Sequence, residues 1–554
     1  MSREPAPRGV RRRLVGEGRW AWSALAVLIG VLVAAPILAV VVDGLVNAGS
    51  AELPDDVGAM TLTSIWLLLG VGIGTSVLGI GLAWLTTAFD FPLRRLLSWA
   101  LVLPLAMPAY ILGFVFLSTF DVAGPVQTAL RDWFGDDVWV PQVRSLGGAV
   151  VVMSLTLYPY VYLMARAAFT EQSARTFDAA RSLGAGRART FWQVLLPLAR
   201  PSLAAGLALV MMETLTDFAT VQYFNVQTVS VGVYLVWKGS YDLHSATQLA
   251  ALVLLFAVAV LAGERMLRGG ARFHQRGGSG EGVARVPLHG VRGWLACLAG
   301  LVVLGAAFVL PVLRLATWAW AGRDGSGTDP LDARFGDYIA NSVSLALVVA
   351  VICVLLAVVI GHAQRLGGGA LVRAAGQATT FGYAVPGAVV GIGVLIVMAW
   401  SDDALVALGV EGGTGLLITG SVIGILIAQV VRFVAPAHQA VDASYAKIAP
   451  SITGSALSLG AGPTRVLARV HLPQLRSGVT VAAVLVLVDV IKELPLVLLL
   501  RPFGFTTVSV WVYQLARENF WEKAALPALL IVVLALVPVF VLIRGREVRG
   551  RNLP

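Results

Sequence analysis

Four acidic residues lie inside long apolar stretches of this sequence, where a carboxylate is costly and therefore informative. They form two pairs, Glu213 with Asp217 and Asp489 with Glu493. Acids within membrane-spanning segments usually face the protein interior or a water-filled pathway. A path lined with carboxylates would suit a cationic substrate, so one interpretation places these residues in a substrate pathway. The other makes them buried structural groups that neighbouring polar side chains satisfy, and the residue types alone leave both open.

The two acidic pairs differ in the bases near them. Glu213 and Asp217 are four residues apart, which places them on one face of a continuous helix, and their stretch holds no Lys or Arg. Asp489 can form an ion pair with Lys492, three residues later. Glu493 has no other base in its own helix. We therefore expect one uncompensated pair and one that is partly compensated.

Residues for other chemistry are sparse. None of the four lysines follows a glycine, so the sequence lacks the G-x-x-x-x-G-K-[ST] loop that cradles nucleotide phosphates. Cys297 and Cys353 both fall in apolar stretches, and the six histidines show no pair at ligand spacing. The sequence predicts no catalytic residue, no metal site and no cofactor bound by this chain.

The composition is that of a membrane protein. Of 554 residues, 58% are hydrophobic and 13% are charged, and the mean hydropathy is +0.82, whereas soluble domains carry about 25% charged residues. A helix needs roughly 20 apolar residues to cross a bilayer. We find about twelve such stretches, which predict an all-α membrane protein with about twelve transmembrane helices. They lie near residues 20–42, 62–87, 98–119, 147–168, 202–223, 246–267, 293–317, 339–361, 378–400, 415–436, 478–500 and 525–543.

Basic residues predict the orientation of these helices. If the N-terminus is cytoplasmic and every stretch crosses once, most Lys and Arg fall in cytoplasmic segments, as the positive-inside rule requires. The first stretch follows Arg11, Arg12 and Arg13 but is too long for a signal peptide, so we expect it to be retained. We expect a multi-pass protein of the bacterial cytoplasmic membrane with both termini cytoplasmic. The net charge of +10 then reflects contact with the lipid bilayer and implies no nucleic-acid partner.

An internal repeat divides the chain. Ser182-Leu183-Gly184 recurs as Ser458-Leu459-Gly460, and Pro197 recurs as Pro473 at the same offset. The acidic pairs are separated by that offset too. Such repeats predict two homologous halves of six spans each, in the same orientation, with a pathway between them. We assign 1–268 and 293–554 to the halves, and 269–292, rich in Gly and Arg, to a cytoplasmic linker.

The repeated residues lie in two cytoplasmic loops, 170–200 and 438–476. In each, a helix-forming stretch ends at a glycine, Gly184 or Gly460, which we expect in the left-handed conformation. A second short helix follows; in the first loop we expect it to run from about Arg187 to Leu196 and to stop at Pro197 and Pro201. Each loop is therefore predicted to be a helix, a glycine turn and a helix.

This loop resembles the signature of permease subunits of bacterial ATP-binding-cassette (ABC) importers: E-A-A, three residues, G, nine residues, I-x-L-P. The second copy has Gly454 in place of the acid. The resemblance implies the type I importer permease fold and loops that dock on a separate ATPase. It also implies two copies of that ATPase, which bind ATP and Mg²⁺, and an extracytoplasmic substrate-binding protein. The implied coupling residues are Asp178, Ala179, Ala180, Gly184, Val194, Leu196 and Pro197, then Ala456, Gly460, Val470, Leu472 and Pro473.

A shorter resemblance concerns the substrate. Two permease domains fused in one chain are similar to ferric-iron and to thiamine permeases, and residues 212–224 look like the ferric-iron type. The resemblance implies ferric iron delivered by a binding protein, with thiamine or another small solute as the alternative. From another class, a secondary transporter can also have twelve spans in two parallel halves, but it does not account for the duplicated loop.

The predicted topology can be tested with reporter fusions at Gly58 and Gly278. These positions lie before the second span and in the linker, so they should report opposite sides of the membrane. Paired phosphatase and fluorescent reporters at each position would show this. If both positions report the same side, the orientation and the count of spans between them are wrong.

Overall fold

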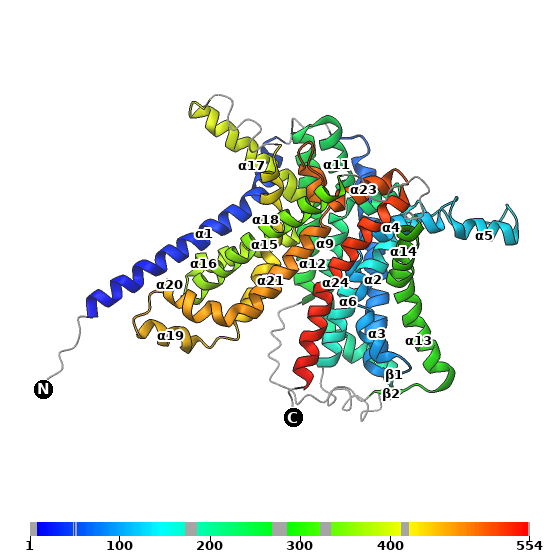
Figure 1. The fold of residues 1–554 in the computed structure, drawn as a ribbon, viewed down its shortest axis with the longest axis horizontal. Coiled ribbons are helices and arrows are strands. Elements are labelled where there is room, and N and C mark those ends of the chain that lie inside the picture. Colours follow the sequence, from blue (N-terminus) through cyan, green and yellow to red (C-terminus); the bar gives the residue numbers. More distant parts are fainter. Residues whose placement is uncertain are drawn as a thin grey trace. The chain divides into compact units, whose positions relative to one another are not determined.

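The computed structural model describes residues 8–47, 49, 53–171, 186–268, 285–321, 334–410 and 420–551. The chain is almost entirely helical within these ranges (Figure 1). Among the described residues, twelve helical segments are long and apolar enough to cross a membrane, which confirms the predicted fold class. They are Arg19–Val46, Val57–Ala88, Ala109–Phe134, Leu146–Thr170, Ala188–Thr216, Leu243–Arg268, Gly290–Ala321, Phe335–Arg365, Gly387–Ala407, Val422–Tyr445, Pro463–Lys492 and Trp521–Pro538.

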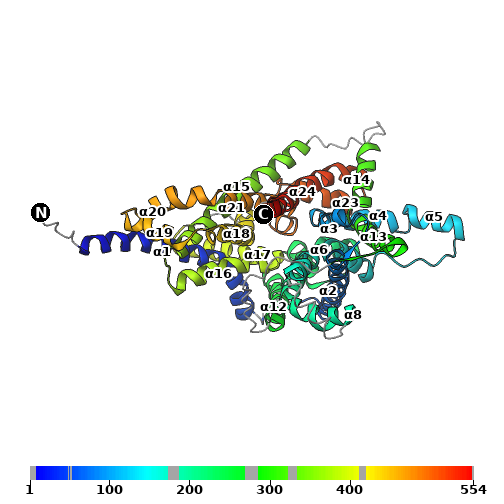
Figure 2. The ribbon, with the colours of Figure 1, turned by 90° about the horizontal axis from the view of Figure 1, so that it is seen from below.

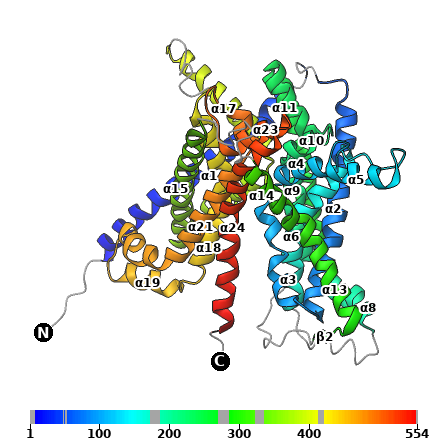
Figure 3. The same cartoon turned by 45° about the vertical axis from the view of Figure 1, so that its right-hand side comes forward.

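The chain forms two compact units. The first unit, 1–51 with 336–507, is built on α18 and α21, which pack on each other, and on α1, which packs on α16 and α17 (Figure 3). Its elements are α1 (Arg8–Val46), α15 (Phe335–Arg365), α16 (Ala370–Ala384), α17 (Gly387–Ala407), α18 (Val422–Tyr445), α19 (Pro450–Ser458), α20 (Pro463–Val466), η4 (Leu467–His471), α21 (Leu472–Lys492) and α22 (Pro495–Leu500).

The second unit comprises 52–335 and 508–554, and helices α2, α6, α9 and α12 form its main bundle. Its elements are α2 (Val57–Ala88), β1 (Phe89–Asp90), α3 (Arg94–Ala100), η1 (Leu103–Ala106), α4 (Ala109–Phe120), α5 (Pro125–Phe134), α6 (Leu146–Glu171), α8 (Arg187–Thr190), η2 (Phe191–Leu195), α9 (Leu196–Thr216), α10 (Phe218–Tyr223), α11 (Val229–Ser240), α12 (Leu243–Arg268), β2 (Val286–Pro287), α13 (Gly290–Leu304), η3 (Gly305–Val309), α14 (Leu310–Ala321), α23 (Val508–Arg517) and α24 (Trp521–Arg551).

The first span of each predicted half packs on helices from the other half. Helix α1 lies along α16 and α17, as Figures 1 and 2 both show, and α14 packs on α4. The α1 contact is close: a side chain added at Gly393 would place its Cβ 2.1 Å from the carbonyl oxygen of Pro36. The compact units therefore do not coincide with the sequence halves 1–268 and 293–554, which remain a prediction about the repeat.

The described end of the predicted linker is ordered against the second span. Strand β2 pairs in parallel with β1, with Phe89 beside Val286 and Asp90 beside Pro287. The amide of Leu288 donates to the carbonyl of Asp90 at 2.8 Å. Residues 269–284 of the linker lie outside the described residues.

Three short π-helical turns each precede a Leu-Pro pair. They are η2, η3 and η4, and the prolines are Pro197, Pro311 and Pro473. A proline inside an α-helix clashes with the carbonyl four residues before it, and the wider turn accommodates that carbonyl. The expectation that Pro197 stops the loop helix is therefore wrong, because the helix continues through η2 into α9, with Pro201 inside it.

Candidate functional site

The fifth span stops at one of the predicted pathway acids. Helix α9 ends at Thr216, and Asp217 turns the backbone (φ −84°, ψ 90°) to cap the short helix α10. The Asp217 carboxylate accepts hydrogen bonds from the amide of Thr220 at 2.9 Å and from its hydroxyl. Glu213 lies one turn before the break. The expectation of one continuous helix face for both acids is therefore wrong.

The eleventh span breaks in the same way. Helix α21 ends at Lys492, Glu493 takes an extended conformation, and the short helix α22 begins at Pro495. The Glu493 carboxylate accepts a hydrogen bond from the amide of Leu496 at 3.2 Å. Asp217 and Glu493 are equivalent in the repeat, and each binds the amide three residues ahead. Both halves thus place a capping carboxylate directly after the end of a span.

The two capping acids differ in their charge partners. Glu493 lies 3.8 Å from the Nε of Arg432 on α18, and both side chains are almost fully buried, at 7% and 5% exposure. The predicted pair of Asp489 and Lys492 is confirmed at 2.8 Å. Asp217 has no ion pair in the described part of the chain. The sequence prediction missed Arg432 because helical spacing relates only bases on the same helix; an arginine within an apolar stretch was the available signal.

Glycines bring a neighbouring helix against each short helix. Gly113 of α4 lies against Thr220 and Tyr223, since a Cβ added to this glycine would lie 3.5 and 3.7 Å from their side chains. Gly391 of α17 lies against Leu496 and Leu499 of α22 in the same way, at 3.6 and 2.5 Å. Gly113 and Gly391 match in the repeat at an offset of 278. A Cβ at Gly113 would make ordinary van der Waals contact with α10, whereas one at Gly391 would clash with Leu499.

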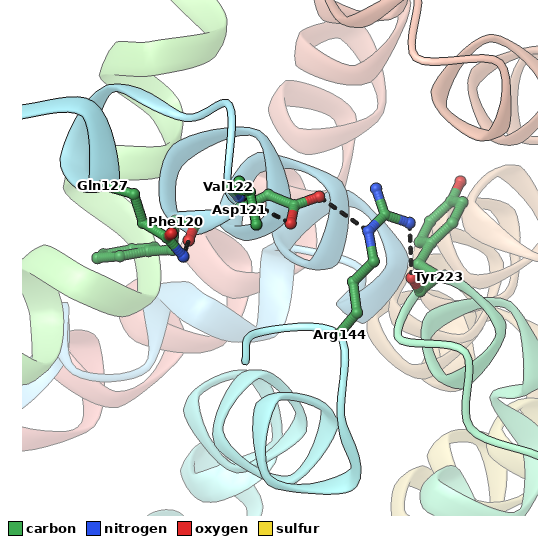
Figure 4. A network of polar contacts seen from close by, with 6 residues as sticks. All are labelled: Phe120, Asp121, Val122, Gln127, Arg144 and Tyr223. Atoms are coloured by element: carbon green, nitrogen blue, oxygen red, sulfur yellow. Dashed lines mark hydrogen bonds and ion pairs between the residues drawn. The ribbon is translucent and has the colours of Figure 1, made fainter. Parts of the chain in front are cut away.

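A polar cavity of about 310 Å³ lies at the far end of α10 from Asp217. Arg144 lines this cavity. Its Nε contacts the Asp121 carboxylate at 2.8 Å, and its guanidinium donates to the Tyr223 carbonyl at 3.5 Å (Figure 4). The Tyr223 hydroxyl in turn donates to the Tyr513 carbonyl at 3.2 Å. Arg517 and several amide side chains also line the cavity: Gln222, Asn225, Gln227 and Asn519.

Another carboxylate serves as a cap outside the spans. Asp242, just before α12, accepts hydrogen bonds from the Ser245 hydroxyl and from the amides of Ser245 and His244. The Ser245 hydroxyl bond, with these amides, holds the pKa of Asp242 below its ordinary value. We assign Asp242 a structural role in starting α12.

The structure describes the second predicted coupling loop throughout. Helix α19 ends before Gly460, whose φ is +88°, and α20 begins at Pro463. The Ala461 amide donates to the carbonyl of Ala456 at 3.1 Å and closes the turn. The predicted helix, glycine turn and helix are confirmed here. Val470 lies in η4, and Leu472 and Pro473 begin α21.

The first predicted loop is described only in part. Asp178, Ala179, Ala180 and Gly184 lie outside the described residues, so their predicted role stays a prediction. Val194 lies in η2, and Leu196 and Pro197 begin α9, as their counterparts do in the second loop.

A buried histidine pair anchors the second loop to its bundle. The Nδ1 atoms of His362 on α15 and His471 in η4 lie 3.1 Å apart, and the Nε2 of His471 lies 3.0 Å from the Thr453 hydroxyl on α19. Trp22 and Tyr445 pack their rings edge-on against the two histidines. Both imidazoles are fully buried. The sequence showed no ligand-like spacing because these two residues come from distant segments.

The first half anchors its loop with apolar side chains instead. Trp84 packs on Phe169 and Phe191 there, and Leu195 stands where the second half has His471. The equivalent of Tyr445 is Phe169. The two loops therefore share a backbone pattern but differ in what attaches them.

Part of this chain matches a known protein family, and most of it is similar to a known permease. Residues 75–267, which include α9, the Asp217 break and α10, match the family described as binding-protein-dependent transport system inner membrane component. The chain is also similar to an Fe(3+)-transport system permease protein, FbpB 2, of Haemophilus influenzae. The two are 24% identical over 531 residues, which cover 94% of this chain and 97% of that protein.

Other relatives match one part of the chain. The molybdenum transport system permease ModB of Escherichia coli is 34% identical over 146 residues, 26% of this chain and 62% of that protein. The sulfate transport system permease CysT of Escherichia coli is 29% identical over 196 residues, 34% and 68% of the two chains. A solved bacterial homologue of the lysosomal transporter Spinster aligns at 13% identity with a TM-score of 0.12, which establishes no shared fold.

Asp217 and Glu493 have different charge partners. Neutralising each acid should therefore lower the free energy of unfolding by a different amount. Glu493→Gln should destabilise the protein by about 3–5 kcal/mol, because it leaves Arg432 buried without its counter-charge. Asp217→Asn should cost less than about 1 kcal/mol, since the amide oxygen can still accept the Thr220 amide. Thermal unfolding of the purified variants measures this.

The control for that comparison is the double variant Glu493→Gln/Arg432→Gln, which removes both charges and should recover part of the lost stability. Equal destabilisation by Asp217→Asn and Glu493→Gln would show that the ion pair is not what distinguishes the two halves.

Proposed function

We propose that this chain is the membrane permease of an ABC importer and that it moves its substrate into the cytoplasm by alternating access. The observation that carries the proposal is the pair of equivalent broken spans, each preceded by a loop of the importer type, in a chain similar to a permease over 94% of its length. Separate ATPase subunits, one for each loop, hydrolyse ATP with Mg²⁺. A binding protein outside the membrane delivers the substrate.

Ferric iron is the substrate that the site favours. Carboxylate oxygens are the ligands that hard, highly charged cations prefer, and Glu213 and Asp217 supply two near one interruption of a span. The similar chain of Haemophilus influenzae is named as an Fe(3+) permease. Asp217 has its carboxylate bound only by neutral donors in the described structure, so its negative charge is available to a passing cation.

An oxyanion is the second candidate. Arg144 and Arg517 line the cavity beyond α10, and guanidinium groups recognise such anions. The shorter relatives are named as molybdenum and sulfate permeases. The acids at the breaks argue against this candidate, because a carboxylate close to the path repels an anion.

The double variant Glu213→Gln/Asp217→Asn tests the substrate path. If the acids line the path of a cation, the variant should lose at least about 90% of ferric uptake at wild-type protein level, a loss of about 1.4 kcal/mol or more in the limiting step. If the acids are only structural, uptake should persist. Radiolabelled iron, molybdate and sulfate uptake, measured in cells that lack this permease, separate the two substrate classes.

The coupling loop is tested by Gly460→Val. The turn needs a positive φ of +88°, which a β-branched residue adopts only with strain. The variant should insert normally, co-purify with less ATPase and lose uptake. Gly454→Ala is the control, because Gly454 is helical and an added side chain there meets open space. Full ATPase recovery with Gly460→Val would remove the docking role of the loop.

A further inference from the structure

Arg314 is a cation inside a membrane span. It lies in α14, within the span Gly290–Ala321, and its guanidinium stacks over the ring of Trp318 at 4.7 Å from the centroid. Its Nε atom is buried and has no hydrogen-bond partner, and no acid pairs with it in the described part of the chain. Stacking covers one face of the guanidinium and leaves its N–H edge to bind an anion.

The guanidinium borders an apolar groove of about 390 Å³. The groove lies between α4 and α14, and among its walls are Leu112, Phe116, Phe120, Leu310 and Leu313. Leu310 and Leu313 are 63% and 55% exposed. Exposed leucines on a membrane-spanning helix face lipid tails, so the groove opens to the hydrocarbon of the bilayer.

Arg314 lies close to one end of its span. It is seven residues from Ala321, or about 10 Å at 1.5 Å per residue. Trp318 and the exposed Trp320 lie between it and that end, where tryptophans mark the level of the lipid headgroups. A long arginine side chain at this depth can reach the headgroup region.

We propose that this groove binds a phospholipid with an anionic headgroup. The phosphate contacts Arg314, and an acyl chain fills the groove between α4 and α14. Three observations argue for a lipid over a protein segment: the unpartnered cation, the apolar walls and the depth beside the tryptophans. The bound lipid bridges α14, the first span of the second half, to α4 of the first half. The inference does not depend on the substrate of the permease.

The test is the thermal stability and lipid affinity of the purified full chain in detergent, titrated with phosphatidylglycerol, phosphatidylcholine or inorganic phosphate. Phosphatidylglycerol should raise the unfolding temperature of the wild type more than phosphatidylcholine does. Arg314→Gln should bind phosphatidylglycerol roughly fivefold more weakly, the factor that corresponds to about 1 kcal/mol for one basic residue near a membrane surface.

The matched control is Lys523→Gln. Lys523 is also a cation stacked over an aromatic ring, 5.3 Å from the centroid of Phe520, but it does not line the groove. This variant should keep the wild-type response. An equal loss with Lys523→Gln would overturn the site, as would a wild type that does not prefer phosphatidylglycerol or that responds fully to inorganic phosphate alone.

A second variant tests the groove without touching the charge. Ala306→Phe fills the groove from its wall, so the response to both lipids should shrink while Arg314 stays in place. An undiminished response would show that no acyl chain occupies the groove and would overturn that part of the proposal. This variant also keeps the test decisive if Arg314→Gln fails to fold.

Discussion

The first backbone amides of a helix have no partners within that helix, and the structure depends on how those amides are satisfied where α10 and α22 begin. Lipid offers no hydrogen bonds, so irregular backbone next to a membrane span needs protein groups or enclosed water to complete it. The carboxylates of Asp217 and Glu493 do this at equivalent positions of the two repeats. The same two groups that permit the breaks also place negative charge there, so the structural and the pathway interpretations of these acids are compatible.

The two repeats share a backbone plan but differ in electrostatics. In the second half, Arg432 neutralises the capping acid, and a histidine pair anchors the loop. In the first half, Asp217 has no ion pair in the described part of the chain, and aromatic side chains anchor the loop. A buried cation near Glu493 lowers the attraction of that break for a cationic substrate. We therefore expect the first half to supply the more attractive carboxylate.

Much of this architecture could be predicted from the sequence because it follows from local patterns. Apolar length predicted twelve spans, and the recurring Gly460 and Pro473 predicted the second loop. The Asp489–Lys492 pair followed from helical spacing. The partners of Glu493 and His471 could not be predicted, because Arg432 and His362 lie far away in the chain and only packing brings them close. Helix α1 packs on α16 and α17 of the other predicted half, and no pattern in the sequence indicates this packing. The helix break had a local signal, since Pro495 follows Glu493 and favours a helix start.

The π-helical turns explain how a proline can follow each repeated loop without ending the helix. From Pro463 to Lys492 the chain is helical for 30 residues, about 45 Å at 1.5 Å per residue. The turn at η4 absorbs the proline clash, so this helix stays continuous. The Gly460 turn lies just before one end, and the Glu493 break lies just past the other. We therefore expect this one continuous helix to transmit a displacement of the loop to the capping acid. The first half repeats this arrangement from η2 through α9 to Asp217.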